Sequence, residues 1–334
     1  MIKGTPKDIG GIDILKIFAA LLIVALHSEL ILSLNTKFHT QLFMIFARMA
    51  VPLFFISSSF LLARHISMHH DQQQAVGKYV KRVSRLYLFW LVLYGYFIVK
   101  ATEANMNING WSIHNFVWGL LRCLLSGPKT MLLGWYLNAS LFSVLFVYYW
   151  FKKHHYLGVA LALISFILVV IFSGYYPLQW PLQVQTSIFV GPIYFYLGKL
   201  LFWWFEHKPR VNYWILAGLT TLVFCLAWWE IHGASFYHGN NDQLFTFPLL
   251  ASLLFLLFLY LPIKLPCAHW WRNLTSFMYL SHYLLMKIFY NFLYFQIHSV
   301  AQRYLIIVGL VLLSYSVVSW LQRYNWAKIL RSAF

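Results

Sequence analysis

The sequence has few acidic residues and little charge of any kind. Its 334 residues include only 8 Asp and Glu, and charged residues make up 10% of the chain. Soluble domains carry about 25% charged residues, so this composition excludes an ordinary water-soluble domain. The three cysteines, Cys123, Cys225 and Cys267, are widely separated, which excludes a disulfide framework and the usual spacing of a metal site. Disordered chains are poor in apolar residues, whereas 61% of this chain is hydrophobic.

Long apolar segments dominate the sequence. A transmembrane helix needs about 20 mostly apolar residues. Segment 111–126 is apolar but short and carries Arg122 near its middle, so it predicts an interfacial or re-entrant helix instead of a span. There is no internal repeat and no long linker, which predicts a single all-α integral membrane domain over residues 1–334. About ten transmembrane helices are expected, near residues 12–34, 41–63, 86–102, 131–151, 156–173, 186–205, 213–231, 244–263, 274–297 and 303–321.

The charge that is present is strongly positive, with 25 Lys and Arg and a formal net charge of +17. In a soluble protein such an excess would indicate a nucleic-acid partner. If the N-terminus is placed in the cytoplasm, however, most of the basic residues fall in cytoplasmic loops and ends, as the positive-inside rule requires. We therefore expect a multi-pass protein of the cell membrane with both termini cytoplasmic, surrounded by membrane lipids and without a nucleic-acid partner.

The first span contains ionisable side chains, which are costly inside a membrane and are therefore candidates for function. Lys16 and His27 are eleven residues apart, so they share one helix face about 16 Å apart along the axis. Asp13 precedes Lys16 by three residues and is able to pair with it. A histidine in a span is a natural proton acceptor for activating a hydroxyl group. Two structural interpretations stay open, namely an interfacial Asp13 and Lys16, and a buried His27 with a structural partner.

The second span carries Arg48, then Pro52 and the serines 57–59. Proline frees a backbone carbonyl, and serine hydroxyls are able to bond such groups within a membrane. The pattern predicts a kinked, polar helix at a cavity wall, or serines that bond neighbouring helices.

A cationic stripe leads into the third span, where Lys78, Arg82 and Arg85 follow one another at helical spacing. Arginine forks bind phosphates well, so the stripe is a candidate phosphate-binding surface. Membrane anchoring or contact with anionic lipids would account for the same residues. The adjacent histidine pairs at 69–70 and 154–155 lack the spacing of a helical metal site, so no metal is expected.

Taken in order, these motifs resemble those of the acyltransferase-3 family of polytopic membrane acyltransferases. Members typically open with Asp, then Arg three residues later, then His after ten more intervening residues. Asp13, Lys16 and His27 match this spacing, with Lys in place of the usual Arg. Segment 48–62 is similar to the family's Val-Pro-Leu-Phe-Phe segment, although a serine stands where glycine is usual. Further similar landmarks are Arg82 with Arg85, Gly134–Leu137, Tyr196–Gly198 and Tyr279–His282.

The resemblance implies a ten-helix membrane fold and an O-acyltransferase. The reaction would move an acyl group, commonly acetyl, from cytoplasmic acyl-CoA to a hydroxyl of a cell-envelope glycan or lipid-linked sugar. His27 would be the catalytic residue, as general base or as transient acyl carrier, with Lys16 in the role of the family's arginine and Asp13 beside it. Arg48, Arg82 and Arg85 are the candidates for binding the donor, acetyl-CoA or another acyl-CoA.

Two other classes of function stay open at this point. An exporter or flippase for a polysaccharide or lipid-linked sugar would suit the 20% aromatic content, because aromatic side chains line sugar-binding cavities. Transporters, however, usually show repeats, and none is visible in this sequence. In a structural or sensory membrane protein, Asp13, Lys16 and His27 would only hold helices together.

Overall fold

A computed structural model describes residues 9–34, 36–128, 131, 134–176, 183–207, 211–236, 242–293, 297 and 299–334. Helices account for all regular structure in these residues, and none of them lies in a β-strand. The α-helices are α1 (Gly10–His27), α2 (Lys37–His69), α3 (Gln72–Leu93), α4 (Gly95–Asn109), α5 (Ile113–Ser126), α6 (Gly134–Leu145), α7 (His155–Val170), α8 (Gly191–Glu206), α9 (Tyr213–Phe236), α10 (Phe247–Leu259), α11 (Ala268–Leu293) and α12 (Val300–Leu321). Short π or 3₁₀ helices are η1 (Phe146–Trp150), η2 (Ile171–Tyr175), η3 (Val184–Thr186) and η5 (Asn325–Ala333).

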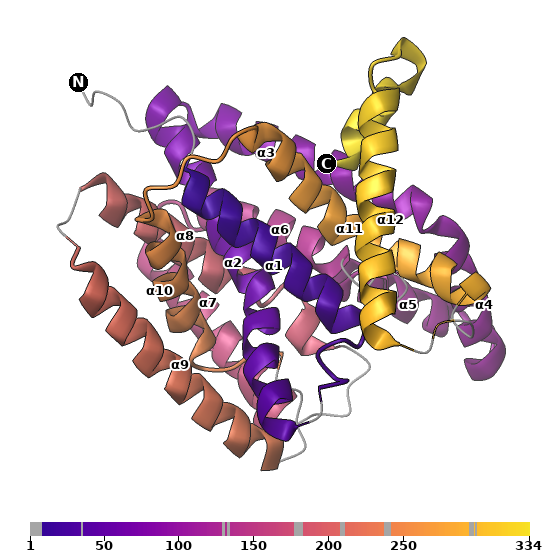
Figure 1. Ribbon diagram of the computed structural model, residues 1–334, viewed down its shortest axis with the longest axis horizontal. Coiled ribbons are helices and arrows are strands. Elements are labelled where there is room, and N and C mark those ends of the chain that lie inside the picture. The colour runs from indigo at the N-terminus through magenta and orange to yellow at the C-terminus, as the bar shows by residue number, and fades with distance from the viewer. Residues whose placement is uncertain are drawn as a thin grey trace.

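Helix α1 crosses the middle of the bundle and packs on α2, α10, α11 and α12 (Figure 1). Helix α2 packs mainly on α8, while α9 and α12 lie on opposite sides of α1 (Figure 1). The C-terminal η5 returns to α3, where Ala333 O accepts a hydrogen bond of 3.0 Å from Trp90 Nε1. Helix α1 and the C-terminal η5 are thus each packed against helices that are distant in sequence.

Five helical segments are long and apolar enough to cross a membrane: Gly10–His27, Phe38–His69, His155–Tyr175, Tyr213–Gly233 and Val300–Leu321. A sixth is possible if α3 and α4, which are bent by 66° at their junction, count as one span. Helices α8 and α10 have 16 and 13 residues. Their lengths are about 24 and 20 Å, shorter than the roughly 30 Å of a bilayer's hydrocarbon core. The structure thus supports five or six of the ten predicted spans, and the orientation of the termini stays a prediction.

Two predicted span boundaries differ from the structure. Helix α1 ends at His27 and not near residue 34, because Ser28 and Glu29 turn the chain and Glu29 adopts a left-handed conformation with φ of 65°. The predicted span at 86–102 is interrupted at Tyr94, whose hydroxyl donates to Leu280 O at 3.1 Å. The next residue, Gly95, has low helix propensity, which makes a break at this position inexpensive.

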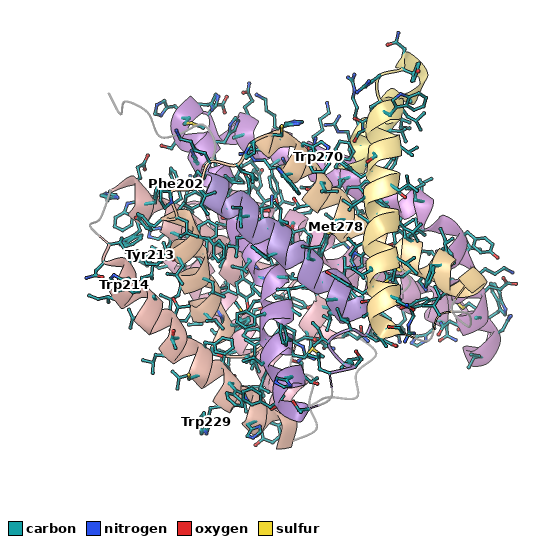
Figure 2. All side chains as sticks on the ribbon, viewed as in Figure 1. Phe202, Tyr213, Trp214, Trp229, Trp270 and Met278 are labelled. Atoms are coloured by element: carbon teal, nitrogen blue, oxygen red, sulfur yellow. The ribbon has the colours of Figure 1, made fainter. Side chains whose placement is uncertain are left out.

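The outer helices present apolar side chains to their surroundings. On α9, Trp214 and Trp229 are 83% and 78% exposed and point away from the bundle (Figure 2). Helix α12 likewise exposes Leu305 and Leu313. Water-soluble monomers rarely expose apolar faces of this extent, whereas lipid tails cover them without cost. The exposed apolar faces of α9 and α12 are therefore suited to contact with lipid.

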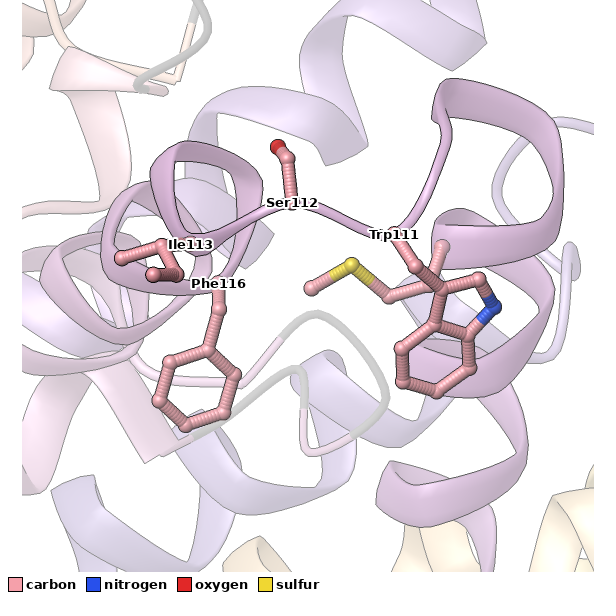
Figure 3. Close-up of a pocket in the computed structure, with 5 residues that line it drawn as sticks. Trp111, Ser112, Ile113 and Phe116 are labelled. Atoms are coloured by element: carbon pink, nitrogen blue, oxygen red, sulfur yellow. The ribbon is translucent and has the colours of Figure 1, made fainter.

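The predicted short helix at 111–126 is present as α5, and none of its residues is buried. A pocket of about 300 Å³ lies where α4 leads into α5 (Figure 3). Its lining consists mainly of apolar side chains, and its only hydroxyl belongs to Ser112; the lining residues are Met106, Trp111, Ser112, Ile113 and Phe116. This pocket contains none of the candidate site residues.

Close backbone contact holds α1 against the end of α10. A Cβ atom at Gly11 would overlap the carbonyl oxygen of Phe258, and one at Gly10 would overlap that of Ile263. Glycine is therefore required where α1 begins, because any side chain would push the two backbones apart. The position of α1 in the bundle depends on this contact.

We predict that Gly11→Ala destabilises the protein by about 1–3 kcal/mol, because overpacking forces backbone shifts. The measurement is thermal unfolding in detergent. Gly218→Ala in α9 is the matched control, since nothing lies within 4 Å of a Cβ atom there. An unfolding temperature of Gly11→Ala equal to that of the control would contradict the close packing of α1 on α10.

Candidate functional site

The first turn of α1 is tied to α11 by an ion pair whose carboxylate is buried. Asp13 is 5% exposed and accepts hydrogen bonds from Arg272 Nε at 2.9 and 3.1 Å and from Arg272 Nη2 at 2.8 Å. This bidentate geometry is the strongest form of an arginine–carboxylate contact. The partner of Asp13 is therefore Arg272, 259 residues away, and not the neighbouring Lys16 that the spacing suggested.

Lys16 lies half-buried one turn further along α1. The charged groups that act on it electrostatically are Asp13, Arg82 and Arg272. We call these four residues the Lys16 cluster. Arg82 is exposed, and its guanidinium carbon lies 5.6 Å from the centre of the Tyr79 ring. Arg85, on the same helix, is exposed as well.

His27 is the last residue of α1, and its ring meets two aromatic side chains of α11. It stacks on His282 with ring centres 5.5 Å apart and an angle of 20° between the planes. Tyr283 approaches it edge-on, with centres 5.9 Å apart. We call His27 and His282 the histidine pair. The pair joins two helix segments that are far apart in the sequence.

Arg48 belongs to the His27 end of the molecule. Its Nε atom lies 3.2 Å from Asp242 Oδ1, and Asp242 is also the charged group that acts electrostatically on His27. Arg48 therefore forms an ion pair with Asp242 close to the histidine pair, whereas Arg82 belongs to the Lys16 cluster. The three arginines proposed as donor ligands therefore do not form one group.

A buried carboxylate holds the segment that carries Asp242. Glu230 of α9 accepts hydrogen bonds from the backbone N–H groups of Phe245 and Thr246 at 2.6 and 2.9 Å. The hydroxyls of Thr246 and Tyr175 donate to it as well, at 2.7 and 3.2 Å. A carboxylate with four donors at the start of α10 is well stabilised there. Glu230 therefore has a structural role, because it fixes Phe245 and Thr246 directly before α10.

Side chains of α2, α6 and α11 fill the interior beside α1. Ser58 and Tyr136 lie within hydrogen-bond distance at 3.2 Å, and the Tyr136 and Tyr279 rings have centres 5.3 Å apart. Ser59 Oγ donates to Phe195 O of α8 at 2.6 Å. Ser58 and Ser59 thus bond neighbouring helices, which was one of the two interpretations of that motif, whereas Ser57 donates to Leu53 O within α2.

Three residues of the site were not selected from the sequence. Arg272 and Asp242 belong to none of the motifs that the sequence offered. His282 was noted as part of a motif, but its contact with His27 had no local signal. Each depends on a long-range contact, which spacing within one helix does not reveal.

The family model described as "Acyltransferase domain", of the acyltransferase-3 type, matches residues 9–321. An amino-acid racemase of Enterococcus faecalis is 26% identical over 234 residues, covering 65% of this chain and 31% of the racemase. A second amino-acid racemase of this organism is 31% identical over 86 residues, covering 25% of this chain and 12% of the racemase. The chain thus spans a third or less of the length of these curated relatives. No solved structure matches the chain.

We predict that Asp13→Asn lowers the stability of the protein, because it leaves Arg272 without its charge partner beside Lys16 and Arg82. Removing one member of a buried pair costs about 3–5 kcal/mol, and the partial exposure of Arg272 reduces that figure. Thermal unfolding in detergent measures the effect, with Lys81→Ala on the exposed side of α3 as control. Unfolding of Asp13→Asn at the wild-type temperature would show that the pair does not hold α1 to α11.

Proposed function

The chain belongs to the acyltransferase-3 family, and we propose that it is a membrane O-acyltransferase. Its donor is acetyl-CoA, and its acceptor is a hydroxyl of a cell-envelope glycan or of a lipid-linked sugar. The observation that carries the proposal is the placement of Lys16 and His27 on one face of α1. One of them belongs to a cationic cluster, and the other meets a second histidine.

The Lys16 cluster is suited to the phosphate groups of the donor. It contains three cationic side chains, Lys16, Arg82 and Arg272, and one carboxylate, that of Asp13. Excess positive charge and arginine donors bind phosphates through charge-assisted hydrogen bonds. The exposed Arg82 and Arg85 provide the first contact for an anion arriving from the solvent at this end.

The separation of the two groups fits an elongated donor. Eleven residues of helix place His27 about 16 Å from Lys16 along the axis of α1. In acetyl-CoA the extended pantetheine arm separates the nucleotide phosphates from the thioester. A donor with its phosphates on the Lys16 cluster would therefore bring its thioester toward the histidine pair.

The His27 end is suited to a polar acceptor that carries hydroxyl groups. The half-buried Tyr283 ring lies against His27, and aromatic rings of this kind stack on sugars. Two ion pairs supply hydrogen-bonding groups at the same end of α1: Arg48 with Asp242, and Arg303 with Glu29 at 3.9 Å. These features favour a sugar hydroxyl as the acceptor.

In the proposed reaction His27 takes the proton of the acceptor hydroxyl. The hydroxyl oxygen attacks the thioester carbonyl, the new ester bond forms and the carbon–sulfur bond breaks. The departing thiolate then takes the proton from His27, so the products are the acylated acceptor and free CoA. A variant of this scheme has His27 carry the acyl group for one step before the hydroxyl attacks.

The name of the curated relatives is not transferred to this chain. The longer match covers 31% of that racemase, so the activity in its name belongs to a protein most of which has no counterpart here. The family match, by contrast, covers nearly the whole of this chain.

We predict that His27→Ala and the more conservative His27→Gln lower acyl transfer at least about 100-fold, because the proton acceptor is lost. The assay follows radiolabelled acetyl groups from acetyl-CoA into a cell-envelope glycan fraction, and mass spectrometry of the glycan confirms the added mass. Both variants should remain folded, with a single unfolding transition, and should keep the wild-type affinity for acetyl-CoA. Full transfer by His27→Gln would contradict the proposed role of His27.

The same assay distinguishes the exporter or flippase described above. An exporter moves the sugar across the membrane without any gain of acyl mass and does not bind acetyl-CoA. If the purified wild-type protein neither binds acetyl-CoA nor labels the glycan, the acyltransferase proposal is wrong.

We predict that Lys16→Ala and Arg82→Ala each weaken binding of acetyl-CoA about tenfold or more. A hydrogen bond to a charged group contributes roughly 1.5–3 kcal/mol, and 1.4 kcal/mol corresponds to a factor of ten. Calorimetry on the purified protein measures the dissociation constant, with Lys81→Ala as control. Arg48→Ala should bind the donor like the wild type, since Arg48 pairs with Asp242. Weaker binding by Arg48→Ala would instead place Arg48 among the donor ligands.

A further inference from the structure

His282 lies in the interior of the molecule, beside the proposed catalytic residue. Its side chain is 0% exposed, and its ring stacks on that of His27 with centres 5.5 Å apart. The reaction proposed above uses only His27 of the pair. A buried polar ring at this position therefore needs an explanation.

The hydrogen bonds of His282 define which ring nitrogen carries the proton. Nδ1 lies 2.8 Å from the backbone carbonyl oxygen of Met278, one turn earlier in α11. A carbonyl oxygen only accepts hydrogen bonds, so Nδ1 must be the donor. In the neutral ring Nε2 then keeps its lone pair and is an acceptor.

That acceptor is buried and has no hydrogen-bond partner among the described residues. The hydroxyls of Tyr279 and Ser281, on the same helix, are buried and unpartnered in the described chain as well. Leaving a buried polar atom unpaired costs about 1–3 kcal/mol, and native proteins rarely do so without a reason. An apolar side chain would fill this interior position without such a cost, so packing alone does not account for a histidine.

We infer that His282 is a positioning residue for His27, an inference that rests on the proposed acyltransferase function. His282 Nε2 accepts a hydrogen bond from the N–H of His27 when the two rings turn from their stacked arrangement to an edge-on one. Catalytic hydrogen bonds are often poorly aligned before substrate binds and tighten in the complex. With one nitrogen of His27 held in this way, its other nitrogen carries the lone pair and faces the acceptor hydroxyl.

This arrangement supports the proposed reaction at two points. It selects the tautomer in which His27 is able to take the hydroxyl proton. Once His27 has taken that proton, its N–H donor to His282 becomes charged, and charge-assisted hydrogen bonds are roughly twice as strong as neutral ones. His282 itself neither touches the thioester nor gains or loses a proton.

The test compares two substitutions of His282, each of which retains the hydrogen-bonding group of one of the two ring nitrogens. In His282→Asn the amide reaches the position of Nδ1 and keeps the contact with Met278, but no acceptor remains near Nε2. In His282→Gln the longer side chain brings an amide oxygen near the position of Nε2. Met286→Leu, a buried apolar exchange one turn further along α11, is the control for packing.

We expect His282→Asn to lower kcat roughly 100-fold, as a misplaced catalytic group does, with the KM and Kd for acetyl-CoA unchanged. His282→Gln should recover a substantial part of that loss, and Met286→Leu should turn over like the wild type. The measurements are transfer of radiolabelled acetyl groups to the glycan fraction, calorimetry with acetyl-CoA, and thermal unfolding of every variant.

Wild-type turnover by His282→Asn would overturn the inference and leave the proposed function intact. Equal losses in His282→Asn and His282→Gln, together with an equally lowered unfolding temperature, would show that His282 only fills space. A wild-type protein that transfers no acetyl group would overturn the proposed function, and the role of His282 with it.

Discussion

The register of α1 against α11 is the constraint on which the site depends. Near the start of α1, Asp13 is bound by Arg272, and at its end His27 stacks on His282. Residue numbers rise together along the two helices, so the helices run in the same direction. The span from Asp13 to His27 is about 21 Å and that from Arg272 to His282 about 15 Å, and the long arginine side chain accounts for the difference. Slippage of either helix by one turn would break both contacts.

Close packing makes this register possible. The glycines that open α1 allow its backbone to touch that of α10, and Glu230 fixes the segment that leads into α10. That segment carries Asp242, which reaches Arg48 of α2. The groups around His27 thus depend on contacts among α1, α2, α9, α10 and α11. The shorter helices α8 and α10 pack on neighbouring helices of the bundle, α8 on α2 and α6, and α10 on α9 and α2.

Local patterns in the sequence predicted those features of the structure that are determined within a single helix. Apolar runs identified most of the helices, the spacing of Lys16 and His27 placed them on one face, and segment 111–126 forms the short helix α5. The order of motifs indicated the family that the match to residues 9–321 establishes. These local patterns did not predict the contacts between helices that are far apart in the sequence. The choice of Arg272 over Lys16 as the partner of Asp13 depends on how two distant helices pack, and so does the stacking of His282 on His27. The end of α1 at His27 depends on a turn that apolar content does not reveal.

The two ends of the shared face of α1 differ in their balance of charge, and this difference bears on the function. The Lys16 cluster contains three cationic side chains and one carboxylate, so positive charge is in excess. Among the described residues around His27 the charges form matched pairs, Arg48 with Asp242 and Arg303 with Glu29. An excess of positive charge favours an anion, whereas matched pairs beside an imidazole favour a neutral molecule that exchanges hydrogen bonds. This asymmetry suits the proposed transfer from an anionic donor to a neutral hydroxyl acceptor. A structural role for Asp13, Lys16 and His27 would require only that each charge have a partner.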